Sequence, residues 1–310
     1  LSLAGASAFV WSWKIGIAVA CVMAAVVASY RQTVHAYPSG GGDYEVATVN
    51  LGSQAGTTVA SALLVDYVLT VAVSISSGAQ YAAGAIPTLS GHESTVAIVF
   101  VILLAAMNLR GIRESGTFFA IPTYAFMVAV LGMCAYGFLE FAAGDLPLAA
   151  SAAYDVEPAP GYGDAMTTAA LVFLLARAFS SGCAALTGVE AISNGVPAFR
   201  RPKSANAATT LLMLGLIAIT MMLSIIVLAK QMGVQIVDPS DIDRLTLNGL
   251  PLPAGTDQHP MIAQMADAIF TDFRPAFYLV VTVTGIILVL AANTAFNGFP
   301  VLGSILAKDG

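Results

Sequence analysis

The stretch LTGVEAISNGVPAFRRPKSA, residues 186–205, interrupts a long apolar run with residues that do not favour a helix. Gly188, Gly195 and Pro197 are weak helix formers, and the acid Glu190 lies among them. Non-helical backbone at membrane depth survives only where protein or a water-filled cavity satisfies its polar groups. The stretch therefore predicts a broken membrane helix with a charged residue beside the break.

The predicted break divides the apolar run 166–198 into two half-helices, about 166–185 and 190–198, which meet around Thr187. Discontinuous helices of this kind expose free carbonyls and helix ends to a substrate or an ion near the middle of the bilayer. The alternative is a continuous, glycine-kinked helix in which Glu190 only caps the second half through its backbone N–H groups.

The rest of the chain has the composition of a membrane protein. Of its 310 residues, 58% are hydrophobic and 10% are charged, whereas soluble domains carry about a quarter charged residues. A bilayer core requires about 20 mostly apolar residues per helix. The sequence offers seven such stretches, which are 8–29, 59–79, 95–109, 117–139, 166–198, 207–229 and 276–294. These runs are long and do not alternate, so we expect an all-α polytopic membrane protein with a single transmembrane domain over residues 1–310.

The distribution of Lys and Arg among the loops predicts the orientation in the membrane. Loops 80–94 and 140–165 contain neither residue, whereas cations follow the first, third, fifth and seventh spans: Arg31, Arg110, Arg113, Arg200, Arg201, Lys203 and Lys308. By the positive-inside rule the basic loops are cytoplasmic, which places the start of the chain outside and its end inside. The long loop 230–275 is then extracellular. Within it, 236–258 looks irregular, and helical spacing of apolar residues predicts a short surface helix in 259–270.

Charged residues inside predicted spans are costly, so each requires an explanation. Asp66 is followed by Thr70 and Ser74 at i+4 and i+8, so the three side chains share one helix face. A carboxylate and two hydroxyls are hard oxygen ligands suited to an alkali cation. The alternative is an aspartate held by a donor on a neighbouring helix, with the two hydroxyls bonded to their own backbone. We expect Arg177 to be a structural counter-charge and Lys14 to reach the membrane surface.

The sequence lacks the signals of an enzyme or a nucleic-acid-binding protein. It contains no GxSxG, HExxH or P-loop motif, and its three histidines lie in separate loops without metal-ligand spacing. Its three cysteines lie in apolar stretches and show no paired spacing. We therefore expect no enzymatic activity, no cofactor and no nucleic-acid partner.

Several stretches together resemble one family of transporters. They are SYRQTVHAYPSGGGDY (29–44), LVDYVLTVAVSISSG (64–78), NLRGIRESG (108–116), LTGVEAISNGVPAFRRPKSANA (186–207) and ANTAFNGFP (292–300). The chain resembles the amino acid–polyamine–organocation transporter superfamily, and in particular its KimA-type branch of potassium importers. Members contain two inverted five-helix repeats of the leucine-transporter kind, followed by two further helices. The resemblance implies that this chain holds helices two to eight of that pattern and is incomplete at both ends.

The resemblance also implies which residues surround the ion. The positions that match the third helix are Asp66, Tyr67, Thr70 and Ser74, and those that match the broken sixth helix are Thr187 and Glu190. On this pattern, potassium is held at Asp66, Thr70, Ser74 and Thr187. Gly188 and Gly195 are then the glycines of the broken helix.

We expect a secondary active importer of potassium in the cell membrane, coupled to proton entry and working by alternating access. A proton on Glu190 or Asp66 would change how well the cavity holds a cation, and the sequence does not decide between the two acids. The expected partners are potassium, protons and the lipid bilayer, with a homo-oligomer as a possible assembly. The alternatives are an amino-acid or amine permease of the same superfamily, and a seven-helix receptor or sensor. Two interior acids favour a cation, and a receptor does not need a broken helix with an acid at its centre.

Overall fold

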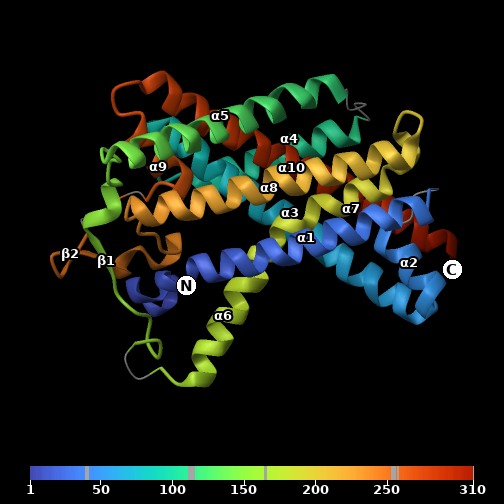
Figure 1. Ribbon diagram of the computed structural model, residues 1–310, viewed down its shortest axis with the longest axis horizontal. Coiled ribbons are helices and arrows are strands. Elements are labelled where there is room, and N and C mark those ends of the chain that lie inside the picture. Colours follow the sequence, from blue (N-terminus) through green and yellow to red (C-terminus); the bar gives the residue numbers. More distant parts are fainter. Residues whose placement is uncertain (39–41, 111–115, 164–165, 253–255, 257, 310) are drawn as a thin grey trace. The chain divides into compact units, whose positions relative to one another are not determined.

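The computed structural model describes residues 1–38, 42–110, 116–163, 166–252, 256 and 258–309. The described chain is dominated by helices (Figure 1). It divides into two compact units, and each is described by itself below. Unit 1 comprises Leu1–Ala60 and Asp155–Val227, and unit 2 comprises Ser61–Tyr154 and Leu228–Gly310.

Each predicted span contains a helix. The apolar helices are α1 (Ser12–Ala36), α3 (Ser53–Ala85), α4 (Glu93–Leu109), α5 (Gly116–Ala143), α6 (Thr168–Gly182), α8 (Lys203–Gln231) and α10 (Arg274–Asp309). Within the described residues, five helices are long and apolar enough to cross a membrane, while α4 and α6 have 17 and 15 residues. The expectation of an all-α membrane protein is confirmed.

Shorter elements connect these helices. The short α-helices are α2 (Gly42–Leu51), α7 (Thr187–Asn194) and α9 (Met261–Ile269). The 3₁₀ helices are η1 (Ser2–Ala4), η2 (Ala6–Trp11), η3 (Pro87–Leu89), η4 (Ala150–Ala153), η5 (Cys183–Leu186), η6 (Val196–Ala198) and η7 (Pro239–Arg244). The strands are β1 (Tyr154–Val156), β2 (Leu245–Leu247) and β3 (Leu250–Pro251).

Strands β2 and β3 form a hairpin inside the segment that we expected to be irregular. They pair antiparallel, with Leu247 opposite Leu250. The two residues between them, Asn248 and Gly249, have φ values of 55° and 76°. Asn-Gly is the preferred pair for a two-residue hairpin turn with positive φ at both positions, so the expectation of irregular structure in 236–258 is wrong at this point.

Unit 1 is held together by α1, α7, η6 and α8. Their buried residues form one hydrophobic cluster: Met23, Val27, Val34, Val189, Val196, Ala207, Ala208 and Leu211. Helices α1 and α8 approach closely where one of them carries a glycine. A Cβ on Gly16 would lie 2.6 Å from Ile226, and one on Gly215 would lie 3.0 Å from Val27. Small residues of this kind let membrane helices pack backbone to backbone.

In unit 2, α3 and α10 run antiparallel along each other. Gly78 of α3 packs against Gly285 and Val289 of α10, and Tyr67 lies against Gly298. Residue numbers therefore fall along α10 as they rise along α3. At about 1.5 Å of rise per residue, the contact covers about 20 Å of helix. A partly buried hydrogen bond, which Nδ2 of Asn108 in α4 donates to Oδ1 of Asn293 in α10 over 2.9 Å, adds to this packing.

The connecting segment of unit 2 packs its short helix against larger ones. Helix α9, which confirms the helix predicted in 259–270, contacts α5 and α10 and buries Met265 and Gln264. The Oγ of Ser151 donates to Gln264 Oε1 over 2.5 Å and accepts from the backbone N–H of Gln235 over 3.0 Å. These bonds fix the segment after α8 to the one after α5.

Candidate functional site

The three residues of the predicted oxygen column on α3 are less exposed than several apolar residues near them in the sequence. The exposed side chains in this region of α3 are Val65, Val68, Leu69 and Val73. Asp66 and Thr70 are half-buried, and Ser74 is buried at 9% exposure. The structure thus brings these three residues together on one face, as predicted.

The side-chain oxygens of this column form no hydrogen bond with the residues that the structure describes. Within the part of the chain that the structure describes, Asp66, Thr70 and Ser74 make no side-chain hydrogen bond or ion pair. By contrast, the hydroxyl of Thr58, earlier in the same helix, donates to the carbonyl of Gln54 over 2.9 Å. This contrast argues against the alternative in which the hydroxyls only bond their own backbone.

Tyr67 places its ring on α10. A Cβ added to Gly298 would lie 3.0 Å from Cζ of Tyr67 and 3.3 Å from each Cε atom. The far end of the phenol ring therefore lies against the α10 backbone. Tyr67 directly follows Asp66 in α3, so both side chains leave the same helix turn.

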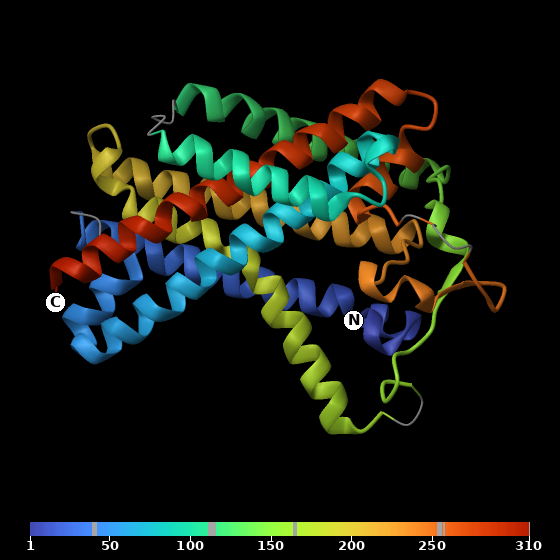
Figure 2. The same ribbon diagram turned by 180° about the vertical axis from the view of Figure 1, so that it is seen from behind.

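The broken helix lies in unit 1, and its break begins earlier than predicted. Helix α6 ends at Gly182, Cys183–Leu186 form a 3₁₀ turn, and α7 begins at Thr187. Figure 2 shows the chain changing direction between α6 and α7. Gly182, the last residue of α6, lies close to α1: a Cβ there would be 2.9 Å from Val19. Gly188 is consequently inside α7 rather than at the break.

Glu190 lies in the first turn of α7. Its Oε1 accepts a hydrogen bond from Nδ2 of Asn194 over 3.1 Å. A carboxylate in the first turn is stabilised by the positive end of the helix dipole. Gly195 ends α7 as its C-cap. The side chain of Thr187 lies outside what the structure describes, so its predicted role as a potassium ligand stays a prediction.

Sequence reasoning missed the residues that surround Glu190. Helix α2, which contacts α7, was not predicted. A Cβ on Gly42, the first residue of α2, would lie 2.3 Å from Oδ1 of Asn194. Beside it, the hydroxyl of Tyr30 in α1 donates to Asp43. The spacing of Glu190 and Asn194, four residues apart on one helix, was the signal that could have identified the Asn194 contact.

The two predicted interior cations behave differently from each other. Arg177 is exposed on α6 and makes no ion pair with the residues that the structure describes, so its role as a counter-charge stays a prediction. The Nζ of Lys14 lies 4.0 Å from the ring centroid of Trp11 and 5.9 Å from that of Trp13. Such cation–π contacts suit a lysine at the membrane surface.

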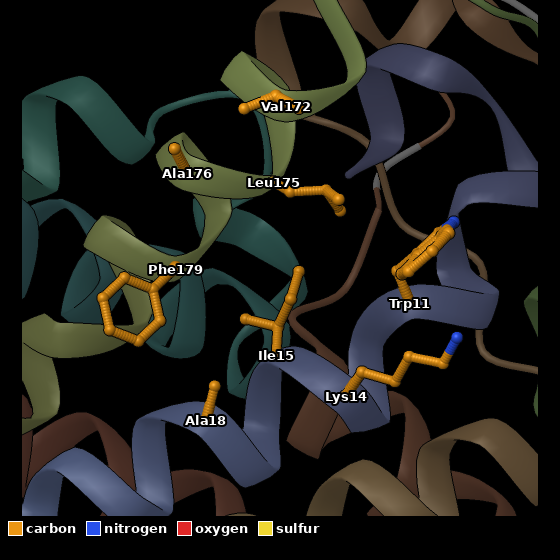
Figure 3. A pocket seen from close by; sticks show the side chains of 8 residues that line it. All are labelled: Trp11, Lys14, Ile15, Ala18, Val172, Leu175, Ala176 and Phe179. Atoms are coloured by element: carbon orange, nitrogen blue, oxygen red, sulfur yellow. The ribbon is translucent and has the colours of Figure 1, made fainter. Parts of the chain in front are cut away.

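A groove of about 410 Å³ lies between α1 and α6 of unit 1. In Figure 3 the side chains of Ile15, Leu175 and Phe179 line it, and Lys14 lies beside Trp11 at one side. Its walls are apolar apart from Lys14, whose charge would repel another cation. The groove is therefore not a candidate for the ion site.

The candidate site residues thus form two groups. Asp66, Tyr67, Thr70 and Ser74 belong to unit 2, and Thr187 with Glu190 belongs to unit 1. In the first group, Asp66, Thr70 and Ser74 offer side-chain oxygens that make no hydrogen bond to the described residues. The second offers a carboxylate beside an interrupted helix.

Comparison with known proteins shows that the chain is similar to transporters. A family model described as amino acid permease matches residues 1–310. Over all 310 residues, the chain is 40% identical to the potassium transporter KimA of Bacillus subtilis (strain 168). The chain spans 46% of the length of that relative.

Proposed function

The chain belongs to the amino acid permease family, and from this membership we propose that it is a secondary active importer of potassium. Uptake is coupled to proton entry and works by alternating access. The observation that carries the proposal is the 40% identity, over all 310 residues, to a potassium transporter. Family membership and the apolar helices make the chain a multi-pass protein of the cell membrane, and both matches are transporters rather than enzymes.

The cation is assigned to the α3 column. A potassium ion that leaves water must exchange its hydration shell for protein oxygens. Asp66 supplies a formal negative charge, and Thr70 and Ser74 supply neutral oxygens one and two turns further along. The absence of hydrogen bonds from these side chains to the described residues supports this assignment, because an oxygen already bonded within the protein is a poorer ligand.

The proton is assigned to Glu190 or Asp66. Protonation removes a negative charge from the site and so lowers its affinity for a cation. A carrier whose cation affinity changes with protonation can couple the entry of both ions. Glu190 lies in the first turn after the helix break, where a change of charge acts directly on the start of α7.

Rubidium uptake, as a tracer for potassium, tests the column in the protein expressed from the complete gene. We expect Asp66→Asn to weaken uptake about 100-fold, since losing about 2.7 kcal/mol of cation binding corresponds to two orders of magnitude in affinity. Thr70→Val is expected to weaken it about tenfold. The matched control is Thr58→Val in the same helix, whose hydroxyl is bonded to a backbone carbonyl. Unchanged uptake in both column variants, at equal protein in the membrane, would overturn the assignment.

An amino-acid or amine permease is the second candidate, because the matching family model is described as an amino acid permease. Competition for rubidium uptake distinguishes a potassium importer from an amino-acid or amine permease. Excess potassium suppresses rubidium uptake by a potassium importer, whereas amino acids and organic amines leave it unchanged. Suppression by an amino acid or amine, with no effect of potassium, would favour the permease.

A further inference from the structure

Helix α10 carries a glycine at the point where the Tyr67 ring lies against it. A Cβ at Gly298 would be 3.0 Å from Cζ of Tyr67, the ring carbon that bears the hydroxyl. Carbon atoms pack comfortably at about 3.5–4.0 Å. The hydrogen atom of Gly298 is therefore the only substituent that leaves the ring where it is.

Other glycines of α10 do not share this property. Gly303, five residues further along the same helix, would have nothing within 4 Å of an added Cβ. Gly285 would meet Tyr81 only at 3.4 Å, an ordinary contact. Glycine in a helix interior destabilises the helix by about 0.5–1 kcal/mol relative to alanine. Close packing of a neighbouring side chain can offset this loss, and at Gly298 that side chain is Tyr67.

We propose that Gly298 is a positioning residue for the cation site: it sets the depth of the Tyr67 ring against α10, and thereby the place of the phenol oxygen relative to the Asp66 column. The inference rests on the proposed function, since it takes the column to bind potassium. It adds a residue of α10 to a site otherwise assigned to α3 in this unit.

The physical effect follows from the direction of the contact. A methyl group at residue 298 pushes on Cζ, so the ring must move by a few tenths of an ångström or tilt about its bond to Cβ. The phenol oxygen lies beyond Cζ and moves further than the ring centre. Relaxing the 3.0 Å contact to a comfortable carbon–carbon distance of about 3.5 Å moves Cζ by about 0.5 Å, and the phenol oxygen moves further. Functional sites must be held within about 0.5 Å of their productive geometry, so this shift reduces cation affinity without unfolding the helix.

Kinetics of rubidium uptake by the protein from the complete gene test the proposal. We expect Gly298→Ala to raise the KM for rubidium about tenfold while the maximal rate per protein molecule stays unchanged. Gly303→Ala, on the same helix, is expected to keep the KM of the unmodified protein. In a Tyr67→Phe background, which lacks the phenol oxygen, Gly298→Ala should raise the KM no further, because the two changes act through one atom.

Several outcomes would overturn the inference. A KM for Gly298→Ala equal to that of Gly303→Ala removes the positioning role, and a further tenfold rise in the Tyr67→Phe background shows that the glycine acts without the phenol. If Gly298→Ala does not reach the membrane, Tyr67→Ala combined with it should restore the level of Tyr67→Ala alone, and failure to do so contradicts the contact. Failure of the proposed function would show separately, as absence of rubidium uptake by the unmodified protein.

Discussion

At the scale of single residues, the hydroxyls of the column on α3 differ from those of other helical threonines in their hydrogen bonding. Most threonines of these helices use their hydroxyl to bond the carbonyl one turn back, as Thr58 and Thr123 do. Thr70 and Ser74 form no such bond to the described residues. A membrane helix gains from satisfying its polar groups internally, so side chains that forgo this bond are candidates for a ligand.

Glu190 gives a prediction at the same scale. Glu190→Gln keeps an oxygen that can accept from Asn194 but replaces the acid with a neutral amide, which mimics the protonated state and cannot cycle. We expect rubidium uptake by this variant to lose its dependence on external pH. Uptake measured across a series of external pH values checks this, with Glu93→Gln, whose carboxylate accepts from the Gly91 backbone, as the control. A pH profile equal to that of the unmodified protein would remove Glu190 from proton coupling.

At the scale of elements, the short helices α2 and α7 form a small unit around the end of the broken helix. Gly42 faces the Asn194 amide, and that amide is already bonded to Glu190. The contact between the two helices therefore depends on a position without a side chain. A residue that is distant in sequence and lies outside the span thus constrains the acid beside the break.

This arrangement predicts the effect of Gly42→Ala. The added methyl must displace the Asn194 amide, and overpacking of this kind costs about 1–3 kcal/mol. We expect the thermal unfolding temperature in detergent to fall. Gly132→Ala in α5, where an added Cβ meets nothing within 4 Å, is the control and should unfold at the same or a slightly higher temperature, because alanine is favoured over glycine inside a helix. Equal stability of both variants would show that residue 42 of α2 has no close steric contact with Asn194 of α7.

Elements with a local sequence pattern were the predictable part of the fold. Long apolar runs are local signals, so all seven spans correspond to helices. The hairpin at Asn248 and Gly249 was equally local but was overlooked among prolines and aspartates. The break at Cys183–Leu186 was placed too late, around Thr187, although α6 already ends at Gly182. The neighbour of Gly182 is Val19, which lies on another helix and is not visible in the local sequence. Pairs such as Tyr67 with Gly298, or Ser151 with Gln264, are far apart in sequence and carry no local pattern.

At the scale of the whole molecule, the orientation deduced from Lys and Arg stays a prediction that labelling can check. We expect a cysteine at Ala153 to react with an impermeant thiol reagent from outside, and one at Ala205 to react only after the membrane is opened. Both positions are exposed, whereas Ser151 is buried and hydrogen-bonded. The background protein needs Cys21, Cys134 and Cys183 replaced, since all three are free and Cys21 is exposed. Reaction of both sites from outside would contradict the orientation.

The lack of a counter-charge for Asp66 among the described residues also has an electrical consequence. With potassium bound, the cation cancels the charge of an ionised Asp66, whereas the empty carrier keeps one uncompensated negative charge. A membrane potential acts on such a charge with about 2.3 kcal/mol per 100 mV when it crosses the whole field. In the alternating-access cycle that we propose, an interior-negative potential would then favour the return of the empty protein to its outward-facing state.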